Sequence, residues 1–298
     1  MMGKKSLANN KKRITALDIG LAVLLSIGAL VIIIPFWNVL VVSFATQKEY
    51  ADNPLMLFPK NPTLESYRYL FRDSKIWQGY INTIKLLIMG LPLSMFLTTT
   101  MAYGLSRKSF PGKKFIIYLV VFTMIFNGGI VPMYLVMKQL KLTGTLWAVT
   151  FSTCFSVFNM ILMMNYFQTI PDSLMESARL DGAGEWRILG SIVLPLSKPI
   201  LATVTLFYGV SIWNEWYDAM IFLRKADMLP LQNVLRSIIQ ETEISTSATG
   251  SIAAMGGPRF DDGIKMAAVF LTMIPIMCFY PLLQKHFTKG VMVGAVKM

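Results

Sequence analysis

Apolar residues gather into six long blocks along the chain, separated by shorter polar segments. Each block is roughly 20 residues long, the length that an α-helix needs to cross about 30 Å of hydrocarbon. Lipid offers no partners to backbone N–H and C=O groups, so continuous apolar runs of this length must be helical. The pattern therefore predicts an all-α membrane protein with six transmembrane helices, at residues 19–44, 80–105, 115–136, 146–167, 199–223 and 266–283.

The basic residues carry the orientation signal, because Lys and Arg concentrate in the cytoplasmic loops of membrane proteins. Five of them lie within residues 4–13 and four within residues 107–114, and three lysines follow the last block. The short loop between the third and fourth blocks has only Lys138 and Lys141. We therefore expect both termini in the cytoplasm.

Composition agrees with membrane insertion. The chain is 54% hydrophobic and 15% charged, with a mean hydropathy of +0.55, whereas roughly 25% of a soluble domain is charged. The net charge of +12 comes mostly from basic residues that bracket the spans, so it does not indicate nucleic-acid binding. The first block is too long for a signal peptide and lacks a small-residue cleavage site. We expect it to be retained, giving a basic tail at residues 1–16 and a single transmembrane domain at residues 17–298.

Catalytic and metal-binding motifs do not occur in the sequence. Cys154 and Cys278 both fall inside predicted spans and form neither a metal-ligand spacing nor a disulfide framework. There is no H-E-x-x-H and no G-x-S-x-G motif, so we expect a protein that is not an enzyme. The G-x-x-x-x-G-K-[ST] phosphate loop is missing as well. We expect no cofactor on this chain, so any ATP-driven work requires a separate subunit.

The loop at residues 168–198, between the fourth and fifth blocks, has a structure of its own. Ser173 and Glu176 form an S-x-x-E pattern that predicts the start of a helix, and Gly182 predicts its end. A second helix is expected from about Gly184 until Pro195, whose ring breaks or kinks a helix. Spacing alone leaves two interpretations open, a helical element that docks onto a partner and a solvated amphipathic connector.

Short motifs within this loop occur at fixed separations. They are Glu176, Ser177 and Ala178, then Asp181, Gly182 and Ala183, and finally Leu194 and Pro195. The pattern resembles the signature of ABC importer permeases, often called the EAA loop, although Ser177 stands where Ala is commoner. The resemblance implies that these residues couple the chain to an ATPase homodimer, which would bind ATP and Mg.

Three further segments resemble permeases for polysaccharide-derived oligosaccharides, namely residues 127–132, 213–216 and 289–295. With six spans and both ends inside, the chain resembles the maltose-permease type of the carbohydrate-uptake (type I) branch. This implies a multi-pass subunit of the plasma or inner membrane that moves an oligosaccharide in a binding-protein-dependent importer. The implied partners are a homologous second permease, the ATPase homodimer, an extracytoplasmic sugar-binding protein and membrane lipid. An ABC importer for a non-sugar solute is the alternative.

Polar groups inside a membrane are costly, so each is a functional candidate. The fifth predicted span carries a cluster that could stack on sugar rings and bond their hydroxyls: Trp213, Asn214, Glu215, Trp216 and Tyr217. The other interpretation places the tryptophans in an interfacial belt and pairs Glu215 with a partner subunit. Lys85 is a candidate counter-charge for Glu215 or Asp218, or a residue that snorkels outward.

Two more candidates for the substrate pathway lie in the third and fourth spans. Asn127, Gly128 and Gly129 precede Pro132, and this combination weakens a helix, as in the broken helices that line cavities. Asn159 is a single amide within the fourth span.

The outer loops contain two amphipathic segments. Residues 63–80 interleave aromatic and charged residues, which is typical of an interfacial helix. Residues 231–239 carry apolar residues at helical spacing and precede a flexible stretch at residues 245–257, which suits either a lid or a connector.

Overall fold

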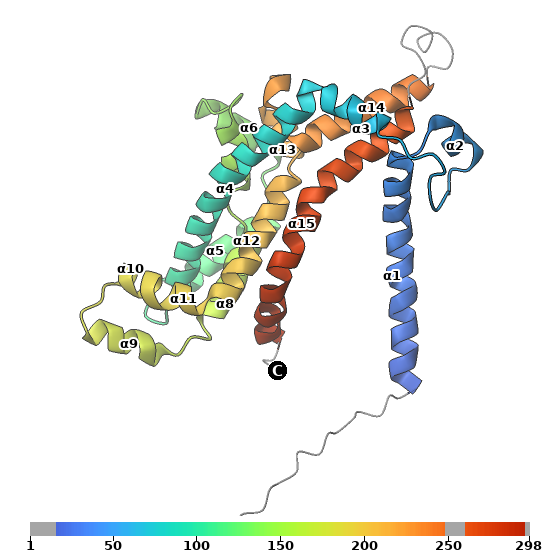
Figure 1. Cartoon of the computed structure of the whole chain (residues 1–298). Helices are drawn as coiled ribbons and strands as arrows, with labels where there is room; N and C mark the ends of the chain where they lie inside the picture. Colours follow the sequence, from blue (N-terminus) through green and yellow to red (C-terminus); the bar gives the residue numbers. More distant parts are fainter. Residues whose placement is uncertain (1–15, 248–259, 296–298) are drawn as a thin grey trace, which may run out of the picture.

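The structure, a computed structural model, describes the backbone of residues 16–247 and 260–295, and the side chains of residues 17–241 and 260–278. Every regular element in the described residues is helical (Figure 1). The all-α prediction is therefore confirmed for this part of the chain. Residues 1–15 of the predicted basic tail, residues 248–257 of the predicted flexible stretch and the side chains of the 289–295 segment lie outside it.

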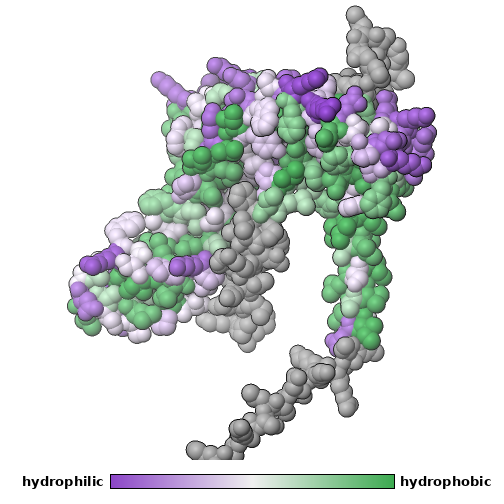
Figure 2. All heavy atoms as spheres, in the orientation of Figure 1, coloured by the Kyte–Doolittle hydropathy of each residue, from purple (hydrophilic) through white to green (hydrophobic). Residues whose placement is uncertain are grey.

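Two helices are long and apolar enough to cross a membrane on their own. They are α1 (Ala16–Ser43) and α4 (Ser74–Ser106), which cover the first and second predicted spans. The sixth predicted span lies within α15 (Asp261–Ala295). α1 is contacted by α15 but stands apart from the other helices along most of its length, with exposed apolar side chains (Figures 1 and 2).

Neither the third nor the fourth predicted span is a continuous helix. The helices concerned are α5 (Lys113–Ile125), α6 (Ile130–Gln139), α7 (Leu146–Thr153) and α8 (Val157–Phe167). The bend is 112° between α5 and α6 and 49° between α7 and α8. The first break falls at the predicted weak point, residues 127–129, whereas the second, at residues 154–156, was not predicted.

The fifth predicted span is also interrupted. α12 (Lys198–Trp213) stops ahead of a break at residues 214–216, and the short helix α13 (Tyr217–Phe222) follows. At its other end, α12 meets the segment Glu185–Leu196 at an angle of 87°. The described residues hold two helices that are long and apolar enough to cross a membrane, or up to five when each bent pair is counted as one span.

The break at residues 154–156 is stabilised by a tyrosine from another helix. The hydroxyl of Tyr208 accepts the backbone N–H of Ser156 at 2.9 Å and shares a hydrogen bond with the hydroxyl of Thr98 at 2.6 Å. A buried N–H without a partner is costly. Tyr208 and Thr98 thereby allow the helix to break inside the core.

Short helices cover the end of the bundle that lies opposite to the loop at residues 168–198. They are α2 (Gln47–Asp52), α3 (Glu65–Arg72), η2 (Ala226–Met228) and α14 (Leu231–Ser247). The single helix predicted over residues 63–80 is wrong: Asp73 separates α3 from α4 and caps α4 by accepting the N–H of Lys75 at 2.9 Å. The predicted amphipathic helix is confirmed as α14.

α14 is fastened to α4 at its start, as a connector would be. The N–H of Leu231 donates to Thr83 Oγ1 at 2.9 Å, and a Cβ on Gly79 would lie only 3.1 Å from the Leu231 Cα. Leu231, Val234 and Ile238 are buried in a core shared with α3, α12 and α15. Figure 2 shows hydrophilic side chains gathered at this end and again around the loop, with a hydrophobic band between them.

Candidate functional site

The loop at residues 168–198 forms a helical hairpin at one end of the bundle, beside the lower end of α4 (Figure 1). Its first helix is α9 (Asp172–Leu180). The predicted capping box is wrong, because Ser173 lies inside the helix, where its C=O accepts the Ser177 hydroxyl at 2.9 Å. Pro171 is the N-cap residue, with extended backbone at φ −57° and ψ 129°. Asp172 therefore lies in the first turn, where the helix dipole stabilises a carboxylate.

α9 ends at the position that Gly182 predicts from the sequence. Gly182 has φ +82°, in the left-handed region that glycine tolerates best. Its N–H donates to the C=O of Arg179 at 3.0 Å, and the N–H of Ala183 donates to the C=O of Ala178 at 2.9 Å. These two hydrogen bonds form a Schellman motif, which ends the helix and sets the direction of the chain that leaves it.

α9 has a buried face and a free face. Met175 is 1% exposed and packs into the core with Ala178 and Ala183. Glu176 and Ser177 are exposed, as are Asp181 and Gly182. At the tip, the apolar side chain of Leu180 is 90% exposed, a feature that the sequence analysis did not single out.

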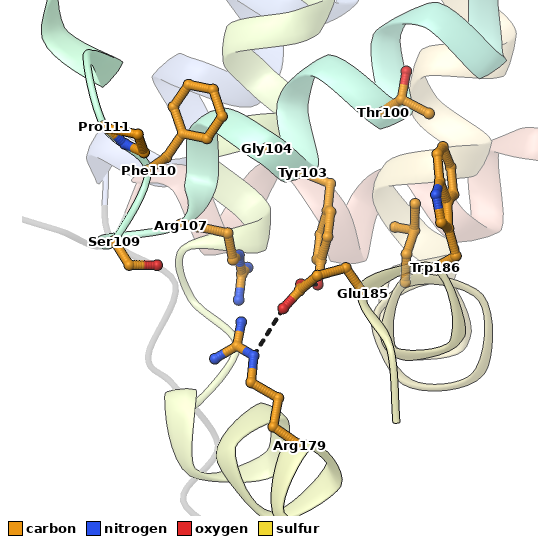
Figure 3. Close-up of a pocket in the computed structure, with 11 residues that line it drawn as sticks. Thr100, Tyr103, Gly104, Arg107, Ser109, Phe110, Pro111, Arg179, Glu185 and Trp186 are labelled. Atoms are coloured by element: carbon orange, nitrogen blue, oxygen red, sulfur yellow. Dashed lines mark hydrogen bonds and ion pairs between the residues drawn. The ribbon is translucent and has the colours of Figure 1, made fainter. Parts of the chain in front are cut away.

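Two polar contacts hold the hairpin against the end of α4. Lys108 pairs with Asp172 at 2.8 Å between Nζ and Oδ2. Glu185 accepts the hydroxyl of Tyr103 at 2.5 Å and the Nε–H of Arg179 at 2.8 Å (Figure 3). The hydrogen bond from Arg179 and, to a smaller extent, the one from Tyr103 lower the pKa of the Glu185 carboxyl. The sequence analysis missed Tyr103, Arg179 and Glu185. The contact of Tyr103 with Glu185 joins elements far apart in the chain, whereas Arg179 and Glu185 meet across the turn of the hairpin.

The second arm of the hairpin carries the remaining motif residues. It consists of α10 (Glu185–Ile188), the π-helical turn η1 (Leu189–Val193) and α11 (Leu194–Leu196). In the π turn, the N–H of Leu194 donates to the C=O of Leu189. The 87° bend into α12 falls at Ser197, two residues beyond the proline predicted to cause it. Leu194 is half-buried against the core and Pro195 is exposed.

The polar cluster of the fifth predicted span lies at the break between α12 and α13. Trp213 is buried, and its indole N–H donates to the backbone C=O of Thr272 in α15 at 3.1 Å. The carboxylate of Glu215 accepts the N–H of Asp218 at 2.8 Å, in the first turn of α13. Trp213 thus packs in the core, while Glu215 caps a helix.

The other side chains of this break face outward and meet α14. Trp216 and Tyr217 are in contact, with ring centroids 5.6 Å apart, and Tyr217 is exposed. The Arg236 guanidinium lies 4.2 Å from the centroid of the Trp216 ring. Asn214 is exposed and accepts the Gln232 amide at 3.1 Å. Arg236 and Gln232 were not candidates in the sequence analysis.

The remaining pathway candidates lie elsewhere. Asn127 accepts the N–H of Gly129 at 2.8 Å, and residues 127–129 are exposed. Asn159 is buried on α8. Lys85 is exposed and, within the described residues, forms no ion pair with Glu215 or Asp218. Within the described side chains, residues 17–241 and 260–278, there is no group of three metal-ligating residues that could hold a metal ion.

The fold is that of an all-helical protein with helices long and apolar enough to cross a membrane. Residues 71–245 match the family described as binding-protein-dependent transport system inner membrane component. The chain therefore belongs to this family of multi-pass inner-membrane permeases, which work with a separate binding protein.

Two relatives from Bacillus subtilis (strain 168) are similar over most of their length. The polygalacturonan/rhamnogalacturonan transport system permease protein YtcP is 40% identical, over 90% of this chain and 94% of that protein. Protein LplC is 38% identical, over 91% of each chain. Among solved structures, a bacterial ABC transporter involved in the import of the acidic polysaccharide alginate is 30% identical with a TM-score of 0.82, over 95% of this chain and 100% of that one.

Proposed function

We propose that this chain is the permease subunit of an ATP-driven importer for oligosaccharides released from polysaccharides. The observation that carries the proposal is the 40% identity to a polygalacturonan/rhamnogalacturonan permease over 94% of its length. The likeness to a solved alginate importer supports the same substrate class.

Six membrane spans, with both termini in the cytoplasm, fit this proposal. The spans are α1, α4, the α5–α6 pair, the α7–α8 pair, α12 with α13, and α15. The start of α1 and the end of α15 point toward the side that carries α9 (Figure 1). The basic residues at 107–114 lie at that end too, as expected for the cytoplasmic side. In this arrangement, residues 17–298 act as one transmembrane domain behind the basic tail.

The free face of α9 is the proposed contact with the ATPase. Glu176 and Ser177 are exposed on a short helix that is closed by a fixed turn and held to α4. The next segment leads through a single bend into α12. A push on α9 would therefore pass into α4 and α12 together.

The break between α12 and α13 is the proposed sugar contact on the outer half of the pathway. Asn214 and Tyr217 offer an amide and a phenol to solvent, beside the half-buried Trp216 ring. Aromatic faces and amides are suited to sugar C–H surfaces and hydroxyls. Trp213 and Glu215 hold this break in shape. The loop at residues 127–129 and Asn159 complete the proposed pathway.

The proposed complex contains a homologous second permease, an ATPase homodimer that binds ATP and Mg, and an extracytoplasmic sugar-binding protein. This chain would bind no cofactor itself. In this complex the ATPase supplies the energy, the binding protein selects the sugar, and the two permeases form the pathway.

Reconstitution of the complete transporter in proteoliposomes tests the proposal. Uptake of labelled oligogalacturonides should require ATP, the ATPase and the binding protein. Glu176→Gln should reduce this uptake while the chain still inserts into the membrane. Ser191→Lys is the matched control, because it makes the same change in charge at an exposed position outside the motif.

Two outcomes would contradict the proposal. Uptake that continues without the ATPase would exclude the coupling role. Uptake of an amino acid or a metal ion, with no oligosaccharide transported, would leave the permease assignment intact and exclude the sugar.

A further inference from the structure

A cavity of about 530 Å³ lies between the cytoplasmic end of α4 and the second arm of the hairpin (Figure 3). This volume falls within the roughly 300–1,000 Å³ that small-molecule sites occupy. Its walls come from α4, from the loop at residues 109–111 and from the hairpin. It lies behind the α9 face assigned to the ATPase, and the proposed function makes no use of it.

Two guanidinium groups and one carboxylate, that of Glu185, line one end of the cavity, which leaves it with an excess of positive charge. The guanidinium groups of Arg107 and Arg179 both line it and point toward one another in Figure 3. Arg179 is paired with Glu185, and the nearby Asp172 is held by Lys108. Arg107 forms no ion pair of its own within the described residues, although the negative charges of Asp172 and Glu185 act on it from a greater distance.

The guanidinium of Arg107 directly contacts three neighbouring side chains. Its Nε and Nη2 donate to the Ser106 hydroxyl at 3.0 and 2.8 Å, Nη1 is directed at the Met175 sulfur, and the group lies 4.8 Å from the Tyr103 ring centroid. All three contacts are with uncharged groups. A half-buried guanidinium beside a second one is a place where an anion is stabilised.

The rest of the cavity lining is mostly apolar, with Thr100 and Ser109 as polar members. Phe110, Trp186 and Leu189 are its large apolar side chains, and Trp186 is 71% exposed. Gly104 leaves space beside α4, since a Cβ there would meet no atom within 4 Å. Trp at this level is typical of the boundary between headgroups and acyl chains.

We propose that this cavity binds an anionic phospholipid of the inner leaflet, with its phosphate between Arg107 and Arg179 and an acyl chain along Gly104, Trp186 and Leu189. A basic end joined to an apolar slot matches a lipid better than a soluble anion, and basic pockets on this side of a membrane suit anionic headgroups. The bound lipid would brace the hairpin against α4. The inference rests on the proposed cytoplasmic orientation and not on the transported substrate.

Trp186 provides the probe for this site, because bromine on a lipid chain quenches indole fluorescence on contact. The complete transporter is reconstituted in phosphatidylcholine vesicles that contain increasing fractions of brominated phosphatidylglycerol or, separately, brominated phosphatidylcholine. The chain has six tryptophans, so the Trp186 signal is taken as the difference between the wild type and Trp186→Phe. Phosphatidylglycerol should quench this signal at a fraction about five- to tenfold lower than phosphatidylcholine does.

Three variants separate a built site from general surface charge. Arg107→Gln should remove the preference for phosphatidylglycerol, and Gly104→Leu, which fills the slot and keeps every charge, should weaken quenching by both lipids. Lys114→Gln removes an exposed charge close by but outside the cavity lining, and should change nothing.

Four results would overturn the proposal. They are equal quenching by the two lipids, equal effects of Arg107→Gln and Lys114→Gln, loss of the phosphatidylglycerol preference on addition of inorganic phosphate, and a Trp186 that neither lipid reaches in the complete transporter. The third would indicate a site for free phosphate, and the fourth a cavity covered by the ATPase. None of the four depends on transport, so each is distinct from failure of the proposed function.

Discussion

Two glycines in the hairpin, two residues apart, provide a matched test of its geometry. At both Gly182 and Gly184 an added Cβ would meet no atom within 4 Å, so neither substitution is crowded. They differ in backbone conformation: Gly182 has φ +82°, whereas Gly184 has φ −70° and ψ 162°. Alanine at the two positions therefore isolates the conformational requirement of the turn.

The two substitutions should differ in the size of their effect on the stability of the turn. An L-residue in the left-handed region costs roughly 1–2 kcal/mol, so Gly182→Ala should destabilise the turn by about that amount. Gly184→Ala should have a small net effect, within about 1 kcal/mol, because the restriction of the unfolded chain by alanine is offset by its poorer fit at the N-cap of α10. A destabilisation of about 1.4 kcal/mol lowers the ratio of native to non-native turn tenfold. The Schellman hydrogen bonds would open, and α9 would lose its fixed angle to α10.

The assay is sugar uptake per ATP hydrolysed in proteoliposomes, together with hydrogen exchange of the peptide that covers α9 and α10. Gly182→Ala should lower the transport ratio and speed exchange, while Gly184→Ala should leave both close to the wild type. Equal behaviour of the two variants would refute the argument, since it would mean that the turn conformation does not govern coupling.

Three further outcomes are expected from the contacts around the hairpin and the core. Tyr103→Phe removes a hydrogen bond to the carboxylate of Glu185, which is half-exposed, so hydrogen exchange should report a hairpin less stable by about 1–2 kcal/mol. Hydrogen bonds, first from Arg179 and then from Tyr103, lower the pKa of Glu185. Their stabilisation is present above the ordinary carboxyl pKa and is lost as pH falls through the lower folded value. Spin-label distances from α9 to α4 should therefore hold at neutral pH and change only below about pH 4. Glu185→Gln should reduce that change and leave the part due to Asp172, whose pKa is lowered by Lys108. Trp213→Ala should lower thermal stability by about 3–5 kcal/mol through loss of a buried side chain, with normal stability and altered sugar preference as the contrary result.

The positions of the spans could be predicted from the sequence because length and apolar composition determine membrane insertion locally. The helix breaks were harder to predict from the sequence. The break near Asn127 has a local signal in two consecutive glycines, and the sequence analysis found it. The break at residues 154–156 lies in a continuous apolar run, and it is stabilised by Tyr208 and Thr98 from distant parts of the chain. No local pattern reports such a contact.

The hairpin shows the same division between local and tertiary signals. The end of α9 follows from Gly182 alone, because few other residues tolerate its conformation. The start was misplaced by the Ser173 pattern, since Pro171 also begins a helix and moves the first turn toward the N-terminus. The contacts that hold the hairpin, Tyr103 with Glu185 and Lys108 with Asp172, join α4 or its following loop to the hairpin. Only the folded chain brings these residues together.

Side chains from this chain satisfy backbone N–H groups at all three breaks in its predicted spans. Asn127 accepts the N–H of Gly129, Tyr208 that of Ser156, and Glu215 that of Asp218. In lipid an unpaired backbone group costs several kcal/mol, so a helix can bend inside a membrane only where such a partner is present. The polar groups that stabilise these bends are therefore structural requirements of the fold, whether or not they also contact substrate. A force applied at α9 and passed through the 87° bend into α12 would reach helices already divided at these points. Those short segments could then rotate about hydrogen-bonded breaks without exposing backbone to lipid.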